Sequence, residues 1–90
     1  MSTTTEAIAK HLKALANKRR LMIIFYLRNG RQVSVGEIAQ EIKLSFKSTS
    51  RHLAVLRAAE IVLSEQQSLA QMYQLAQPHS PFVNYILTMC

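Results

Sequence analysis

Residues 34–59 read SVGEIAQEIKLSFKSTSRHLAVLRAA and contain two helix signals with a short link between them. Ser34 is a good N-cap residue, and Glu37 three positions later completes the pattern of a capping box. Apolar residues then recur at helical spacing up to Lys43-Leu44, which form a tight connection. Ser45 caps the next helix, which extends to the end of the stretch. Two helices joined this closely predict a helix-turn-helix.

The second helix of the pair has two different faces on a wheel of about 100° per residue. The face expected in the core carries Thr49, Leu53 and Leu56. The opposite face carries short side chains around two cations, namely Lys47, Ser50, Arg51 and Ala54, with Ser48 on the flank. Such a face suits a helix that enters the DNA major groove, about 12 Å wide, where Arg51 can pair bidentately with guanine. It also suits a solvated surface whose charges only keep the protein soluble.

His52 and a basic triplet are each open to more than one interpretation. His52 lies between the two faces of its helix and can bind a phosphate or satisfy a half-buried hydrogen bond. Lys18, Arg19 and Arg20 open an earlier helix, where their positive charge opposes the helix dipole. These charges therefore do not stabilise their own helix. We expect packing or a salt bridge to fix Arg20, and we expect Lys18 and Arg19 to face DNA or solvent.

Two helices are expected before this pair. Residues 5–16 place apolar side chains on one stripe. Asn17 caps a helix over about residues 18–28 that is apolar nearly all round and therefore belongs at the centre of the core. Gly30 ends it, because glycine readily adopts the left-handed conformation found after helix ends. Residues 31–33 are too short to classify well and are compatible with a brief strand.

A hairpin is expected after the pair. Residues 61–63 and 72–75 are short β-prone runs, joined by a polar tip over residues 66–71. A hairpin directly behind a helix-turn-helix forms a wing. The order of elements therefore predicts a mainly α, winged helix-turn-helix domain over residues 1–90, with about five helices and a two- or three-stranded β-wing.

A last helix is expected over about residues 80–89, with Ser80 as its cap and Pro81 at its first position. Its apolar stripe consists of Phe82, Tyr85, Ile86 and Met89. This stripe can pack on its own domain. Alternatively, it can meet a second copy of the chain across a two-fold axis, together with Ile8 and Leu12.

Length, composition and charge exclude several classes of protein. Ninety residues form one domain, and a hydrophobic fraction of 49% excludes a disordered basic tail. The net charge of +6 predicts a polyanionic partner, which should meet residues 1–57 because they carry +8. We expect a cytoplasmic protein without a membrane partner, since we find neither a signal peptide nor a bilayer-spanning apolar run. The chain has no Asp and no catalytic constellation, so we do not expect an enzyme.

Cys90 is the single cysteine of the sequence. One cysteine excludes an internal disulfide framework and a self-contained zinc finger. The simplest interpretation of Cys90 is an inert terminal thiol. A redox switch through a disulfide between two subunits is the alternative.

Three runs of sequence resemble the ArsR-type repressors. Residues 12–21, LKALANKRRL, are similar to the opening motif of that family. Residues 35–39, VGEIA, and residues 44–57, which include STSRHLAVLR, are similar to its helix-turn-helix. The resemblance extends from about Lys10 to Leu75. It implies a homodimeric winged-helix transcription factor, usually a repressor, with the first and last helices at the dimer interface.

The sequence departs from this family in its metal ligands and in its wing. Ser34 and Gly36 stand where many members carry a cysteine pair for metals, and the last helix lacks the carboxylates of the family's zinc site. We therefore expect no metal and no cofactor. The family wing usually carries Arg or Lys at its tip, whereas this tip is uncharged and follows Glu65. The wing should supply hydrogen bonds, through Gln67 and Ser68, and little counterion release.

These observations together predict a sequence-specific transcriptional regulator. We expect a homodimeric repressor that reads a palindromic operator in double-stranded DNA with the helix over about residues 45–59. The alternative is a winged-helix module for protein–protein contact, favoured by the uncharged wing and the apolar last helix. The residues expected to contact DNA are Ser45, Lys47, Ser48, Ser50, Arg51, His52, Gln67 and Ser68. The residues expected at the dimer interface, on helices over about 5–16 and 80–89, are Ile8, Leu12, Phe82, Tyr85, Ile86 and Met89.

Overall fold

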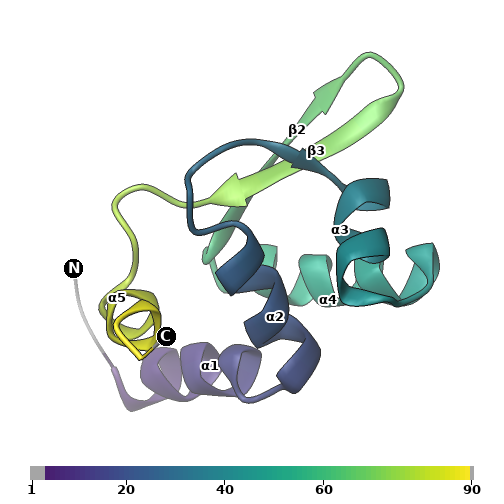
Figure 1. Ribbon diagram of the computed structural model, residues 1–90. Helices are drawn as coiled ribbons and strands as arrows, with labels where there is room; N and C mark the ends of the chain where they lie inside the picture. Colours follow the sequence, from purple (N-terminus) through teal and green to yellow (C-terminus); the bar gives the residue numbers. More distant parts are fainter. Residues whose placement is uncertain (1–3, 90) are drawn as a thin grey trace.

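The computed structural model describes residues 4–89, and Figure 1 shows its path from helix to wing. Within this range five helices and a three-stranded antiparallel sheet confirm the predicted winged helix-turn-helix. The helices are α1 (Thr5–Leu15), α2 (Lys18–Tyr26), α3 (Val35–Ile42), α4 (Phe46–Ala58) and α5 (Pro81–Leu87). The strands are β1 (Val33–Ser34), β2 (Val62–Gln67) and β3 (Ala70–Leu75).

The helix starts confirm the capping signals of the sequence. Asn17 accepts hydrogen bonds from the amides of the first turn of α2, and Ser34 accepts one from the Glu37 amide at 3.1 Å. Ser45 and Ser80 cap α4 and α5 in the same way. Each cap satisfies backbone donors that the first turn of a helix would otherwise leave unpaired.

The helix ends are less regular than their starts. Helices α2 and α5 each end two residues before the expected position, because their last residues form tighter i to i+3 bonds instead of continuing the helix. Gly30 follows α2 with a φ of 85°, as predicted for its left-handed position. Between α3 and α4, Lys43 has a φ of 55°, and this single left-handed residue turns the chain from one helix of the pair to the other.

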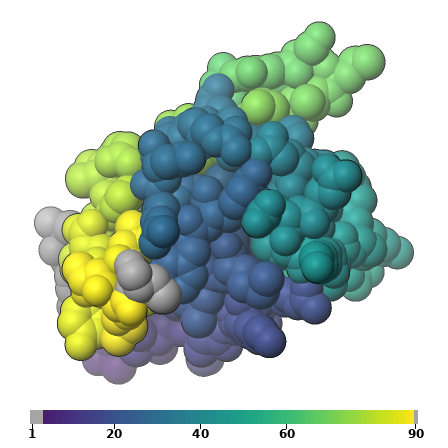
Figure 2. Space-filling view, in the orientation of Figure 1, coloured from purple at the N-terminus to yellow at the C-terminus, as the bar shows by residue number. Residues whose placement is uncertain are grey.

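The wing is longer than its sequence indicates. The order of strands is β1-β3-β2, and the register of β2 against β3 runs from Val62 opposite Leu75 to Gln67 opposite Ala70. The prediction of a polar tip over residues 66–71 is wrong, because four of these six residues pair with each other in the ladder between β2 and β3. The turn is Ser68-Leu69 alone, with a φ of 58° at Ser68. The result is a two-stranded ribbon that projects beyond the helical body, as Figure 2 shows.

The core forms around α2. Ile23, Ile24 and Leu27 have no exposed surface, which confirms that the all-round apolar helix is central. α3 and α4 pack against it with the apolar positions that their periodicity indicates. The last helix is held by Val83, only 1% exposed, which lies outside the stripe recognised in the sequence. Tight packing at these positions fixes the orientation of α4 relative to the rest of the domain.

Two arginines in the first turn of α2 bind the ends of two other helices. The Arg20 guanidinium donates to the carbonyl of Ala14 at 2.6 Å and to that of Lys13 at 3.3 Å, at the C-terminus of α1. Arg19 donates to the carbonyls of Ile42 and Lys43, at the C-terminus of α3. Positive charge at a helix C-terminus is favourable because the dipole is negative there. Arg20 is thus fixed by carbonyls rather than by a salt bridge, and Arg19 is bound to the end of α3 instead of lying free in solvent.

Arg20→Gln should lower the free energy of unfolding more than any loss of an exposed positive charge on α2. A charged hydrogen bond of this kind contributes about 1.5–3 kcal/mol, and the substitution also leaves two carbonyls without their partner. Denaturant unfolding, followed by circular dichroism, measures the difference. Lys18→Gln is the matched control, since Lys18 is exposed on the same turn. Equal stabilities of the two variants would contradict the capping role of Arg20.

A second polar cluster joins α2 to α3. The Glu37 carboxylate accepts hydrogen bonds from the Tyr26 hydroxyl and from Arg31, the latter at 2.7 Å. The Arg31 guanidinium also lies 5.7 Å from the centre of the Tyr26 ring. The hydrogen bonds from Tyr26 and Arg31 lower the pKa of Glu37, and the bond to Glu37 raises the pKa of Tyr26. The cluster therefore favours ionised Glu37 in the folded chain.

Acid should destabilise the protein partly through Glu37. Its pKa is lower in the folded chain than the ordinary value of 4.5, so its contribution is complete above that value and is lost as the pH falls through the folded pKa. Glu37→Gln should therefore show a smaller loss of stability between about pH 6 and pH 3 than the parent chain. Unfolding by urea across this range is the measurement, with the exposed Glu41→Gln on the same helix as control. An unchanged pH profile in Glu37→Gln would refute the contribution.

Among residues 4–89, no helix has the length and apolar character needed to cross a membrane.

Candidate nucleic-acid interface

Helix α4 presents the cationic face that its sequence predicts. Its inner face is fully buried, with no exposed surface on Thr49, Leu53 or Leu56. Lys47 and Arg51 are exposed on the other side, and in the described part of the chain neither forms an ion pair. An anchored helix with two unneutralised cations is suited to bind a polyanion, because its charges need no rearrangement before contact.

The serines of this helix differ in their surroundings. Ser48 and Ser50 are half-buried on either side of the cations, whereas Ser45 is exposed. The Ser45 hydroxyl accepts a hydrogen bond from the Ser48 amide at 3.1 Å, since it is the N-cap of α4. Ser45 therefore has a structural role as the cap of α4. Among the described residues, the hydroxyls of Ser48 and Ser50 form no such hydrogen bond to the backbone.

His52 connects α4 to α2. Its Nδ1 lies 3.2 Å from a terminal nitrogen of Arg20. A guanidinium can only donate hydrogen bonds, so Nδ1 accepts and the ring proton belongs on Nε2. Burial lowers the pKa of His52, and the nearby charges of Arg20 and Arg19 lower it further. His52 is thus a neutral ring that satisfies a half-buried hydrogen bond and keeps an N–H donor on its other side.

Phe46 is a candidate contact that the sequence analysis missed. It is the first residue of α4 and is 62% exposed, beside Lys47. Apolar side chains at this place can contact the methyl group of thymine in a major groove. The sequence signal for this contact was the position of Phe46 directly after the N-cap Ser45. At the first position of a helix that starts outside the core, a large aromatic side chain is left exposed to solvent.

The wing carries hydrogen-bonding groups that are partly bound to each other. The side-chain amide of Gln67 donates to Gln32 at 2.6 Å, and Gln32 donates to Glu65 at 2.9 Å. Ser68 is exposed at the turn, and Leu69 beside it is 99% exposed. Gln67 and Ser68 therefore lie together near the tip of the wing, and the side-chain amide of Gln67 already donates a hydrogen bond to Gln32.

The candidate interface on the two terminal helices has an inner and an outer part. Ile8, Phe82 and Ile86 are half-buried, and the rings of Phe82 and His11 lie 5.7 Å apart between α5 and α1. Phe82 and Ile86 pack on the core of their own domain. The outer residues are exposed large apolar side chains, namely Leu12, Tyr85 and Met89. The stripe of the last helix is thus divided between packing on its own domain and an uncovered apolar face.

No cluster of three or more His, Cys, Asp or Glu side chains that could hold a metal ion is found in residues 4–89. Cys90 lies outside the described residues.

Comparison with known sequences gives consistent results. The family model described as "Bacterial regulatory protein, arsR family" matches residues 17–64. The transcriptional activator HlyU of Vibrio cholerae is 38% identical over 65 residues, which are 72% of this chain and 59% of that protein. The transcriptional regulator NmtR of Mycobacterium tuberculosis is 33% identical over 78 residues, which are 87% of this chain and 64% of that protein. The chain thus spans about six tenths of the length of these relatives.

Solved structures agree with the fold. A structure of HlyU from Vibrio cholerae matches with a TM-score of 0.79 and 31% identity, covering 99% of this chain and 92% of that one. A homodimeric winged helix-turn-helix DNA-binding domain from Mycobacterium bovis matches with a TM-score of 0.81 and 26% identity. The match covers 93% of this chain and 75% of that one. HlyU and NmtR are both named as regulators of transcription.

Proposed function

This chain belongs to the ArsR family of bacterial regulatory proteins, and we propose that it is a sequence-specific DNA-binding regulator of transcription that acts as a homodimer. The observation that carries the proposal is the cationic face of α4, with Lys47 and Arg51 exposed above a fully buried inner face. A module for protein contact alone has no need of two unneutralised cations on this helix.

In this proposal α4 enters the major groove. Arg51 pairs with a guanine, and Lys47 neutralises a phosphate near the start of the helix. Ser48 and Ser50 are short enough to let the helix approach, and their hydroxyls reach phosphates or base edges. The Nε2–H of His52 donates to a phosphate while Arg20 holds the other ring nitrogen.

The wing adds contacts without adding charge. Gln67 and Ser68 offer hydrogen bonds to the backbone or the minor groove, where readout is degenerate. Because Glu65 is the charged residue of this strand, the wing releases few counterions. The salt dependence of binding should therefore come from the helices, with about 6–10 phosphate contacts for a dimer.

The proposed dimer joins α1 and α5 of two chains through the uncovered side chains Leu12, Tyr85 and Met89, with Ile8, Phe82 and Ile86 beneath them. A two-fold interface of this kind places two copies of α4 on one DNA duplex. Recognition helices about 34–36 Å apart read successive turns of the major groove, so the operator is an imperfect palindrome. The domain from Mycobacterium bovis, which is named as homodimeric and DNA-binding, supports the proposal of a homodimer.

The proposed direction of control is repression by promoter occlusion. A dimer that covers its operator blocks access by exclusion alone and needs no further contact. Relatives named as repressors support this choice, although HlyU is named as an activator.

Selection of bound sites from random double-stranded DNA tests the proposal most directly. We expect a palindromic consensus with half-sites one helical turn apart, and binding that weakens steeply with salt. A protein-contact module would enrich no consensus and would show no DNA shift at physiological salt. That result would overturn the proposed function. A consensus with a single half-site would overturn the dimer.

A further inference from the structure

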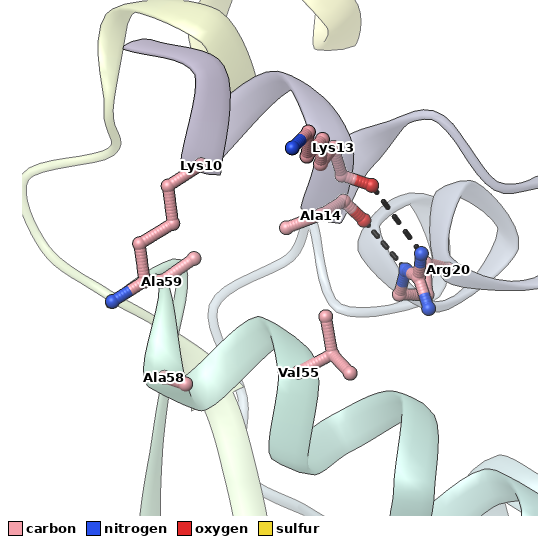
Figure 3. A pocket seen from close by; sticks show the side chains of 7 residues that line it. All are labelled: Lys10, Lys13, Ala14, Arg20, Val55, Ala58 and Ala59. Carbon is pink, nitrogen blue, oxygen red and sulfur yellow. Dashed lines mark hydrogen bonds between the residues drawn. The ribbon is translucent and has the colours of Figure 1, made fainter. Parts of the chain in front are cut away.

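A cavity of about 340 Å³ lies between α1 and the second half of α4, and none of its lining residues is proposed to contact DNA or a second chain (Figure 3). Two kinds of residue line it: the cations Lys10, Lys13 and Arg20, and the small apolar side chains Ala14, Val55, Ala58 and Ala59. Its volume falls in the range of small-molecule sites, which begins at roughly 300 Å³.

The charge around this cavity is of one sign. Lys10 and Lys13 are exposed on α1, and in residues 4–89 neither forms an ion pair. No carboxylate is among the lining residues. Cations that line one cavity without a counterion create a positive potential, which a low-dielectric wall strengthens. The cavity therefore attracts an anion.

The floor of the cavity is apolar. Val55 is 40% exposed there, a large fraction for a valine in the middle of a helix. Ala58 and Ala59 continue this surface along α4, and Figure 3 shows the Lys10 side chain reaching from α1 toward it. A bare inorganic anion would leave this surface in water. An anion with a hydrocarbon part would cover it and gain the free energy of apolar burial.

We propose that the cavity between α1 and α4 binds a small amphipathic organic anion, with its charged group between Lys10 and Lys13 and its hydrocarbon part on Val55 and Ala58. The site faces away from the proposed dimer interface. At about 100° per residue, Lys10 lies roughly 160° around α1 from both Ile8 and Leu12. The ligand can therefore enter while the dimer is intact.

The cavity also adjoins the hydrogen bond between Arg20 of α2 and His52 of α4. Arg20 lines the cavity, donates to the end of α1, and hydrogen-bonds His52 on α4. A bound anion brings negative charge into the cavity that Arg20 lines and thereby changes the electrostatic environment of the hydrogen bond between Arg20 and His52. Its binding is therefore coupled to DNA affinity, and coupling between two sites is reciprocal. This second step rests on the proposed function.

A methyl NMR titration of the full chain with hexanoate tests the site without DNA. We expect saturable shifts at the methyl groups of Ala14, Val55, Ala58 and Ala59. The probes 1-hexanol and sulfate, which lack the charge and the hydrocarbon part respectively, should bind more weakly. Absence of saturable shifts at these methyls, or equal binding of either control probe, would overturn the proposal.

Variants separate the site from general attraction of anions. Lys10→Gln with Lys13→Gln should weaken hexanoate binding about tenfold, as expected for two partly exposed charge contacts. Lys18→Gln, which removes a charge outside the cavity, should leave binding unchanged. Ala58→Leu changes an exposed helical position, keeps the charge, and obstructs the apolar floor of the cavity, so it should abolish binding. Unchanged binding in Ala58→Leu would place the ligand elsewhere and overturn the proposal.

The coupling is measured with the selected operator at constant ionic strength. Saturating hexanoate should change operator affinity in the parent chain and leave that of Ala58→Leu unchanged. Hexanoate binding with unaltered operator affinity would overturn the coupling. If the chain binds no DNA even without hexanoate, the proposed function fails, and the methyl titration still decides the site.

Discussion

A chain with glutamate in place of both Leu12 and Tyr85 should be monomeric and should bind the operator about 10²–10⁴-fold more weakly, because two linked half-site contacts become one. These side chains are 49% and 67% exposed, so the fold of a single chain does not depend on them. In the proposed two-fold interface each glutamate would be buried against the second chain. Charge without a partner is costly in such a place.

Sedimentation velocity measures the mass of this double variant, and a titration of operator DNA measures its affinity. The matched control is Leu63→Glu with Gln77→Glu, which adds the same charge at exposed positions outside the proposed interface. The control should stay dimeric and lose affinity only through its charge. A double variant that remains dimeric would show that α1 and α5 do not form the interface.

Arg51→Ala should weaken operator binding by about 1–3 kcal/mol, roughly 5–150-fold, and relax sequence preference at one base pair in each half-site. The reason is that a guanidinium pairs bidentately with guanine, and alanine leaves that base edge unread. Lys47→Ala should act differently. It should weaken binding to all sequences similarly and reduce the salt slope by about 1.

Fluorescence anisotropy with the operator and with single-base variants of it separates these two effects. Arg57→Ala is the control, since Arg57 is exposed in the last turn of the same helix. An Arg51→Ala chain with its sequence preference intact would remove Arg51 from base reading and would leave it, at most, a phosphate contact.

Local chemistry made much of this fold predictable from the sequence. Ser34, Ser45 and Ser80 each lie directly before a helix, and a hydroxyl that accepts from an amide three residues later needs no tertiary contact. The inner face of α4 was predictable for a similar reason, since helical periodicity alone separates Leu53 from Arg51.

Features that depend on distant partners were not predictable in this way. Pairing between β2 and β3 extends the wing into a segment that looks like a polar loop, because glutamines pair in a ladder as well as other residues do. Arg19 finds its carbonyls 23 residues away, at Ile42. Val83 is buried although it lies off the apolar stripe, since the surface of the domain beneath α5 decides which side faces inward.

The first turn of α2 connects the helix proposed for dimerisation to the helix pair proposed for DNA binding. Arg20 binds the C-terminus of α1, which would meet a second chain, and Arg19 binds the C-terminus of α3, which leads into α4. The distance between the two copies of α4 in a dimer would then depend on this one helical turn. Inserting one residue between Arg19 and Arg20 would rotate their side chains by about 100° relative to each other. The positions of α1 and α3 would then no longer agree, and the two copies of α4 could not match the pitch of the duplex.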